Sequence, residues 1–148
     1  MTTRPEISTE AVRAAHELRV LFGRLRRRLR EVADRNGLTP SQVSVLSRLA
    51  TSGPASASDL AAAEHVRPQS MAAILAPLTE QGLVDRTPDP TDGRRQLVSL
   101  TPTGQARVAG DREAREEWLA RALQERYTDA ERRILVEALA LLDRLTES

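Results

Sequence analysis

The sequence contains no cysteine, which excludes disulfide bonds, thiolate metal sites and a thiol nucleophile or redox switch. Its two histidines, His16 and His65, are far apart and do not have the spacing of a zinc site. No glycine-rich phosphate loop is present, and neither histidine lies beside a plausible nucleophile. We therefore expect no cofactor and no metal, and we expect that the protein is not an enzyme.

Lysine is also absent, so all 22 basic residues are arginines, against 21 acidic residues. A guanidinium group donates paired hydrogen bonds to phosphates and base edges, although a compositional bias of the genome also explains the missing lysine. Aromatic residues make up only 2% of the chain, namely Phe22, Trp118 and Tyr127. Proteins that bind RNA or single strands stack bases on aromatic platforms, which this chain cannot build. Any nucleic-acid partner is therefore expected to be duplex DNA.

Long apolar runs are missing too, since none approaches the roughly 20 residues needed to span a bilayer. Residues 1–10 are polar and lack the apolar stretch of a signal peptide. A length of 148 residues, with 40% hydrophobic and 29% charged residues, is typical of one soluble globular domain. We expect a single cytoplasmic domain over residues 1–148, without a membrane partner.

A long amphipathic helix is predicted over residues 10–35, with Asn36-Gly37 as its end. Apolar residues recur along it in a strict 4-3 alternation, which places them in one stripe. The stripe comprises Ala11, Ala15, Leu18, Phe22, Leu25, Leu29 and Val32. Five arginines lie in residues 24–30, and such a run is either a solvated face or a contact to phosphate.

Three further helices are predicted before the first strand. The first begins at Thr39, because Thr39-Pro40-Ser41-Gln42 is a capping box with proline in its first turn, and it stops at Gly53-Pro54. A short helix follows over residues 58–65, and the next helix runs from Pro68 to Gly82. Two short helices joined by a tight turn form a helix-turn-helix.

The helix that opens at Pro68 has one predicted buried face. This face comprises Met71, Ile74, Leu75 and Leu78. Pro77 lacks the N–H that would donate to the carbonyl of Ala73. We predict a kink or an early end of the helix there.

Residues 83–87 and 96–100 are predicted as two short strands, with a segment rich in turn formers, residues 88–93, between them. They form a β-hairpin with a projecting tip. Thr101-Pro102 then caps a helix that runs to about Arg126.

The last helix begins at a second capping box, Thr128-Asp129-Ala130-Glu131, and carries two apolar stripes. One stripe is Ile134, Ala138, Leu141 and Leu145, and the other is Leu135, Leu139 and Leu142. A helix packed on one core needs a single stripe. The second stripe indicates a further covering surface, and the economical covering is another copy of the chain. We therefore expect a homodimer.

Three segments resemble the MarR (multiple antibiotic resistance regulator) family. They are SDLA at residues 58–61, LTEQGLVDR at residues 78–86, and DPTDGRR at residues 89–95 running into LVSLTPTG at residues 97–104. The second is similar to the family pattern Leu-Glu-x-x-Gly-Leu-Val-x-Arg, and the third to the wing pattern Asp-x-Arg followed by Leu-x-Leu-Thr-x-x-Gly. The flanking helices also match the family in number and length.

This resemblance implies a mainly α fold with a small β-hairpin wing, an α+β winged helix-turn-helix with flanking dimerisation helices. Residues 38–100 would bind DNA, and residues 10–35 and 102–148 would form the dimerisation helices. The implied function is sequence-specific, duplex-DNA-binding transcriptional regulation at a pseudo-palindromic operator. Repression is the commonest mode of the family.

On this resemblance, Arg94 at the wing tip enters the minor groove and reads its negative potential. Asp92 braces Arg94 or a nearby arginine by a charge-assisted hydrogen bond, and Arg95 contacts a phosphate. The alternative is an ordinary exposed hairpin whose charges serve solubility.

On this resemblance, the helix that opens at Pro68 is the recognition helix, and its outward face follows from its buried face. Gln69 is expected to pair with adenine, Ser70 to contact a base or phosphate, and Arg67 to contact a phosphate. Ala73 is expected to meet a thymine methyl group, as Ala72 and Ala76 could too. Ala73 and Pro77 depart from the basic or polar residues that the family often has there. Gln69 and Ser70 are otherwise simply polar residues of a first helical turn.

Many family members are released from DNA by small aromatic or phenolic effectors. His16 is a weak candidate for an effector contact, because a lone histidine on a helix is more often a surface or core residue. The alternative function is a helical homodimeric protein-interaction module without DNA binding, since residues 36–110 hold six arginines and six acidic residues. The operator, the regulated genes, the effector and the direction of regulation do not follow from the sequence.

Overall fold

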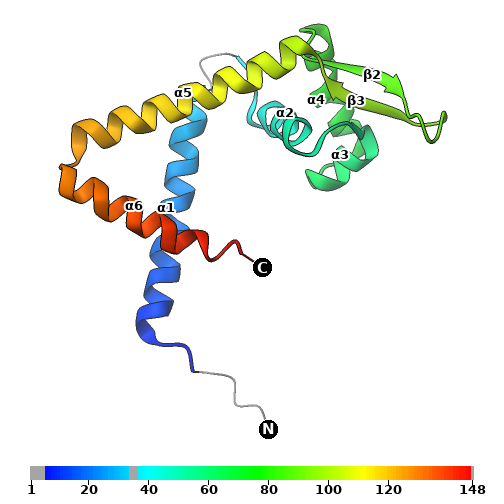
Figure 1. The fold of residues 1–148 in the computed structure, drawn as a ribbon. Helices are drawn as coiled ribbons and strands as arrows, with labels where there is room; N and C mark the ends of the chain where they lie inside the picture. The colour runs from blue at the N-terminus through cyan, green and yellow to red at the C-terminus, as the bar shows by residue number, and fades with distance from the viewer. Residues whose placement is uncertain (1–5, 34–36, 148) are drawn as a thin grey trace. The chain divides into compact units, whose positions relative to one another are not determined.

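The computed structural model describes residues 6–33 and 37–147, and the chain forms two compact units, residues 1–111 and residues 112–148. Figure 1 gives the order of the elements within the described ranges, six helices and three short strands. The predicted fold class, mainly helical with a small antiparallel hairpin, is confirmed. Asn36, predicted as part of the end of the first helix, lies outside the described residues.

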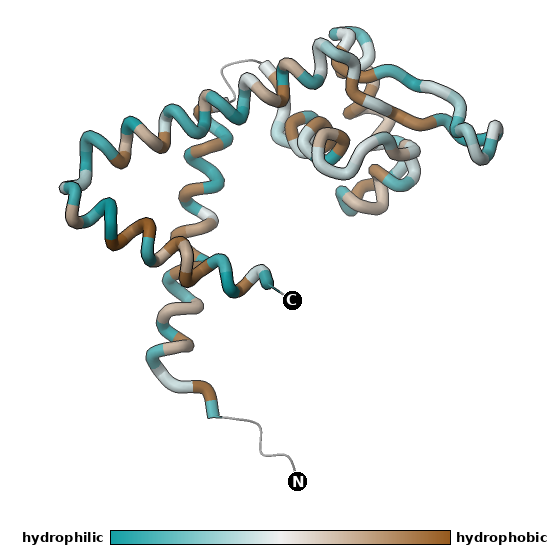
Figure 2. The backbone as a smooth tube through the Cα atoms, in the orientation of Figure 1, coloured by the Kyte–Doolittle hydropathy of each residue, from teal (hydrophilic) through white to brown (hydrophobic). Residues whose placement is uncertain are grey.

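Helix α1 spans Thr9–Ala33, close to its predicted bounds. Figure 2 shows apolar segments distributed along it among polar ones. Leu21 and Phe22 are 61% and 66% exposed, so these apolar side chains are not covered within one chain. Large apolar side chains that one chain leaves exposed normally pack against a further surface.

Helices α2 (Pro40–Ser52), α3 (Ala57–Ala63) and α4 (Pro68–Glu80) build the core of the first unit. The predicted capping box at Thr39 is confirmed. Thr39 Oγ1 accepts the N–H of Gln42 at 3.3 Å, and the Gln42 side chain accepts the N–H of Thr39 at 2.9 Å. Gly53 ends α2 as predicted, with a positive φ of 81°. Capping by short-range polar contacts therefore fixes both ends of α2.

The predicted hairpin is present as β2 (Val84–Pro88) and β3 (Gln96–Leu100), paired from Val84↔Leu100 to Pro88↔Gln96. A two-residue strand that the sequence analysis did not predict, β1 (Ala55–Ser56), pairs with β3 and gives the sheet the order β1-β3-β2. The sheet and the three helices enclose one core. Its fully buried large side chains are Val45, Leu46, Leu60, Met71, Leu75, Leu78, Val84 and Val98.

The predicted early end of α4 at Pro77 is wrong, because the helix continues to Glu80. Leu75 and Leu78 are both fully buried, so core packing on either side of Pro77 outweighs the missing main-chain hydrogen bond. Thr79 Oγ1 donates to the carbonyl of Leu75 at 3.0 Å within the same turn. The other predicted outcome, a kink, stays a prediction.

Helices α5 (Pro102–Arg126) and α6 (Asp129–Asp143) follow the sheet, and the second unit comprises the C-terminal part of α5 together with α6. Arg132 of α6 donates to the carbonyls of Leu123 and Tyr127 and pairs with Asp129. This arginine therefore satisfies carbonyls at the end of α5, where no further helical N–H is available. Helix α6 itself has no buried residue over Asp129–Asp143.

Candidate nucleic-acid interface

The turn between α3 and α4 sets the position at which α4 begins. His65 in this turn has a left-handed φ of 55°. Glu64, the C-cap of α3, accepts the Ser44 hydroxyl at 3.0 and 2.9 Å and the Arg48 Nε–H at 2.9 Å. Ser44 and Arg48 belong to α2, so this largely buried carboxylate ties the turn to a second helix. Such a network holds α4 in one orientation against the core.

Helix α4 presents one buried and one exposed face, as predicted. Met71, Leu75 and Leu78 are buried and Ile74 is half-buried. The exposed positions include Arg67, Gln69, Ser70, Ala72, Ala73 and Ala76. The structure thus brings the predicted base-reading residues together on one face, and their contacts to bases stay a prediction.

The tip of the hairpin, residues 89–95, is shaped by its own side chains. Asp89 accepts the N–H and the hydroxyl of Thr91 at 2.9 and 2.8 Å, and these hydrogen bonds lower the pKa of the Asp89 carboxyl. Asp92 Oδ1 accepts the main-chain N–H of Arg94 at 3.1 Å. This contact shapes the turn that carries Arg94, and the predicted charge-assisted brace of an arginine by Asp92 stays a prediction.

Arg95 points back toward α3. Its Nη2 donates to Asp59 Oδ2 at 2.7 Å and to Ser56 Oγ at 3.0 Å. Ser56 is also the N-cap of α3, where its hydroxyl accepts the N–H of Asp59 at 3.1 Å. The guanidinium that the sequence analysis assigned to a phosphate thus has protein acceptors in this structure, and its phosphate contact remains a prediction.

An open hollow of about 510 Å³ lies between the hairpin and the start of α3. Three arginines, Arg86, Arg94 and Arg95, line it together with Ser58 and Asp59. Cationic side chains on a surface of this kind attract the phosphates of a nucleic acid.

The pairing of the hairpin with α3 was missed by the sequence analysis, which began that helix at Ser58. One local signal was available. Ser56 is followed three residues later by the acidic Asp59, and the apolar Leu60 comes next. This pattern is typical of a helix that has Ser56 as its N-cap. The partner Arg95 has no comparable signal, because it follows Ser56 by 39 residues.

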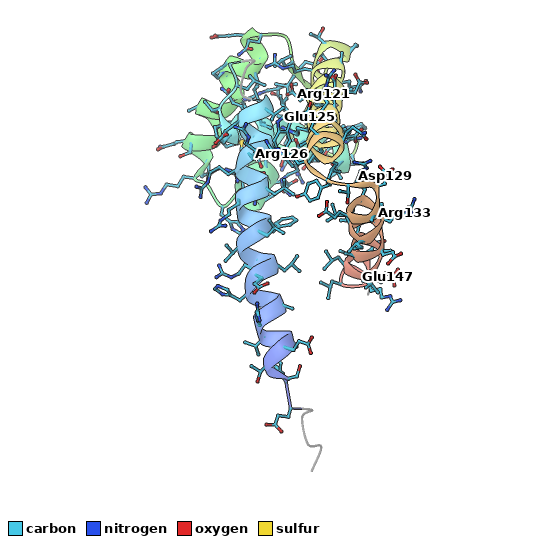
Figure 3. The ribbon with its side chains drawn as sticks, turned by 90° about the vertical axis from the view of Figure 1, so that its left-hand side faces the viewer. Arg121, Glu125, Arg126, Asp129, Arg133 and Glu147 are labelled. Atoms are coloured by element: carbon cyan, nitrogen blue, oxygen red, sulfur yellow. The ribbon has the colours of Figure 1, made fainter. Side chains whose placement is uncertain are left out.

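Charged side chains also gather where α5 ends and α6 begins, as Figure 3 shows. The labelled residues there are Arg121, Glu125, Arg126, Asp129 and Arg133. Arg121 pairs with Glu117 at 2.7 Å, and this hydrogen bond raises the pKa of the Arg121 guanidinium. Both signs of charge alternate among these residues, so they form no continuous cationic face.

Two features are absent from residues 6–33 and 37–147. No group of three or more His, Asp or Glu residues there could hold a metal ion. No helix in those ranges is long and apolar enough to cross a membrane.

A helix-turn-helix followed directly by a β-hairpin, with arginines at both, defines a winged-helix DNA-binding protein. The model of the MarR family matches residues 38–95. An uncharacterized HTH-type transcriptional regulator of Mycobacterium bovis is 42% identical over 135 residues, covering 88% of this chain and 94% of that protein. The HTH-type transcriptional repressor MdtR of Bacillus subtilis is 30% identical over 87 residues, covering 59% of this chain and 56% of that protein.

The crystal structure of a transcriptional regulator from Pseudomonas aeruginosa has a TM-score of 0.81 with 34% identity. That likeness covers 96% of this chain and 99% of the other. The chain belongs to the MarR family and is a DNA-binding transcriptional regulator. Regulators of this family bind DNA and act as dimers. None of these findings favours the alternative of an interaction module without DNA binding.

Proposed function

We propose that two copies of this chain bind a pseudo-palindromic operator, with each α4 in the major groove and each hairpin wing at the adjacent minor groove. A helix fits a major groove that is roughly 12 Å wide, and two-fold symmetry of the protein requires two matching half-sites. The observation that carries the proposal is that the exposed face of α4 and the arginine-bearing wing project from one shared core.

On α4, the base contacts are assigned to Gln69, Ser70 and Ala73, and a phosphate contact to Arg67. All four are exposed and lie in the first two turns or at the N-cap. Gln69 has the paired donor and acceptor that adenine requires, and the methyl group of Ala73 suits a thymine methyl. Because the helix continues past Pro77, the exposed Ala76 is also available to the groove.

On the wing, Arg94 is assigned to the minor groove. Asp92 accepts the main-chain N–H of Arg94 and so fixes the backbone conformation at this residue. The guanidinium is therefore carried by an ordered turn rather than by a free loop. An arginine placed this way reads the narrow, electronegative minor groove of A·T-rich DNA.

The homodimer is supported by the apolar side chains that each chain leaves exposed. Ile134, Leu139 and Leu145 of the C-terminal segment are 63%, 62% and 72% exposed. Exposed large apolar side chains at this density mark an interface, and a second copy of the chain is the simplest partner. Residues 10–35 and 102–148 are therefore proposed to form the dimer.

Repression, with release by a small aromatic or phenolic effector, is the mode of regulation that we propose. The related MdtR is a transcriptional repressor, which supports the first part. His16 remains a weak candidate for an effector contact, and it is exposed on α1.

The test is binding of the purified protein to the DNA upstream of its own gene, measured at two salt concentrations. We expect affinity to fall steeply with salt, because arginines that neutralise phosphates release counterions. Arg94→Ala should weaken binding by a few kcal/mol per dimer, at about 1–3 kcal/mol for each specific contact. The far-UV circular dichroism of this variant should match that of the wild type.

A matched control is Arg121→Ala, which removes an exposed, ion-paired arginine from the second unit. It should leave the affinity within about twofold of the wild type, as expected for a weak surface pair. Equal affinities for wild type and Arg94→Ala would remove the wing from the mechanism, and no binding to any duplex at low salt would contradict the proposed function.

A further inference from the structure

We propose that Arg95 is a positioning residue that latches the wing to α3 through Asp59 and Ser56, and that it thereby orients Arg94. The latch, defined as Arg95, Asp59 and Ser56, deepens the DNA-binding function proposed above and rests on it. It replaces a direct phosphate contact as the role of Arg95.

The first argument is the position of Arg95 along the wing. Strand β1 covers β3 only at Leu97 and Val98, so beyond Leu97 the hairpin continues as a two-stranded ribbon. A two-stranded ribbon is marginally stable in water by itself. Arg95 lies just beyond the part of β3 that pairs with β1. Its side chain attaches the two-stranded ribbon to Ser56 and Asp59 at this point.

The second argument is hydrogen-bond capacity. A guanidinium Nη carries two hydrogens, and Arg95 Nη2 has two acceptors, Asp59 Oδ2 at 2.7 Å and Ser56 Oγ at 3.0 Å. The first bond joins opposite charges, which makes it the stronger of the two. A phosphate that used this nitrogen would have to displace a carboxylate that already neutralises it.

The third argument is that the latch ends on well-anchored groups. Ser56 pairs with Leu97 in the sheet and caps α3, and the next two residues after Asp59, Leu60 and Ala61, are buried. A side chain attached here is therefore attached to the core rather than to a mobile loop.

The fourth argument connects the latch to Arg94. The carbonyl of Arg95 accepts the N–H of Asp89 at 2.9 Å, and its own N–H donates to the carbonyl of Asp92 at 3.0 Å. Asp92 Oδ1 in turn accepts the main-chain N–H of Arg94 at 3.1 Å. The tip is thus closed on itself, and the side chain of Arg95 is the link that fixes this closed turn to α3.

The test compares Arg95→Gln, Asp59→Asn and the double variant with Arg94→Gln, all in the full chain. Without DNA, we expect amide hydrogen exchange of residues 89–95 to be faster in the first three proteins and unchanged in Arg94→Gln. Asp59→Asn removes only the charge, so it keeps the size of the side chain at the start of α3. Unchanged exchange in both Arg95→Gln and Asp59→Asn would overturn the latch.

DNA affinity across a salt series supplies the second readout. We expect Arg95→Gln and Asp59→Asn to weaken binding alike, roughly threefold at each wing and so about tenfold for two half-sites. The double variant should bind DNA no more weakly than either single variant. The slope of log affinity against log salt concentration should match that of the wild type in all three. Arg94→Gln should weaken binding more and should flatten the slope.

A direct phosphate contact gives the opposite pattern. Asp59→Asn would then leave the affinity unchanged or raise it, because a negative charge near DNA is lost, and Arg95→Gln would lower the salt slope by about 1 for each contact. That pattern would overturn the proposal. If the wild type binds no duplex, the proposed function fails, whereas the exchange measurement still decides whether the latch exists.

Discussion

At Gly104 the main chain of α5 passes against the loop that leads into β2. A Cβ atom there would lie 2.0 Å from the carbonyl oxygen of Leu83 and 2.9 Å from its carbonyl carbon. Thr101 holds this approach, since its hydroxyl donates to the carbonyl of Gly82 at 2.5 Å and accepts the N–H of Gly104 at 3.0 Å. The Thr-x-x-Gly spacing thus joins the wing to α5, and only glycine fits its last position.

We predict that Gly104→Ala lowers the free energy of unfolding by about 3 kcal/mol, because the added methyl group meets main-chain atoms that cannot move aside. Gly110→Ala is the matched control on the same helix, since among the described residues no atom beyond its chain neighbours and its own helix backbone lies within 4 Å of its Cβ position. That change should stabilise the protein by up to about 1 kcal/mol through helix propensity. Urea denaturation of both variants is the measurement, and equal effects would contradict the close approach.

At the scale of the element, α2 and α6 both begin with a capping box, but the side chain that accepts the N-cap N–H differs in charge. In α2 the reciprocal acceptor is the neutral Gln42, whereas in α6 it is Glu131. Hydrogen bonds from the N–H and the hydroxyl of Thr128 lower the pKa of the Glu131 carboxyl below its ordinary value of 4.5. A carboxyl with a lowered folded-state pKa stabilises the fold above its unfolded pKa, and this contribution is lost as the pH falls through the folded pKa.

We therefore predict that Glu131→Gln makes the stability of α6 less sensitive to acid. Glutamine keeps the capping geometry without titrating. Relative to the wild type, the variant should gain stability as the pH falls from about 5 to below 4.5, and the two should differ by a constant amount above that window. The measurement is urea unfolding at a series of pH values, followed by far-UV circular dichroism. A difference that stays constant through the acid range would show that the cap does not titrate.

At the scale of the whole molecule, the proposed dimer rests on exposed apolar surface rather than on net charge. The net charge is +1, which neither drives nor prevents self-association. Helix α6 carries two apolar stripes and has no buried residue over Asp129–Asp143, and Leu141 is 57% exposed. Burying such side chains against a second copy removes them from water, at about 25 cal/mol for each Å² of apolar area.

We predict that Leu141→Glu weakens dimerisation at least about 30-fold, as expected when a central apolar contact is replaced by a charge. Its neighbour Ala140 lies about 100° from Leu141 around the helix and faces away from the middle of the two apolar stripes. Ala140→Glu is therefore the matched control with the same added charge. Sedimentation equilibrium over a range of protein concentrations measures both. Equal effects of the two variants would place the dimer interface elsewhere, and a monomeric wild type would contradict the proposed dimer.

Local signals predicted much of the fold. The capping boxes at Thr39 and Thr128 gave the starts of α2 and α6, and the turn formers between residues 88 and 93 gave the hairpin. Strand β1 was missed because two residues are too short to show a period. The early end at Pro77 was wrong, since the rule for proline describes an isolated helix and the core holds this one together.

What the sequence by itself determined is the series of helices, the hairpin and the family, because capping, hydrophobic period and turn chemistry act between residues a few positions apart. The partners of Arg95, Glu64 and Gly104 were decided only by the tertiary structure. Arg95 and Asp59 are 36 residues apart, and they meet because β3 pairs with β1 in one register and β1 leads directly into α3. Contacts of this kind depend on how whole elements pack, which no local pattern encodes.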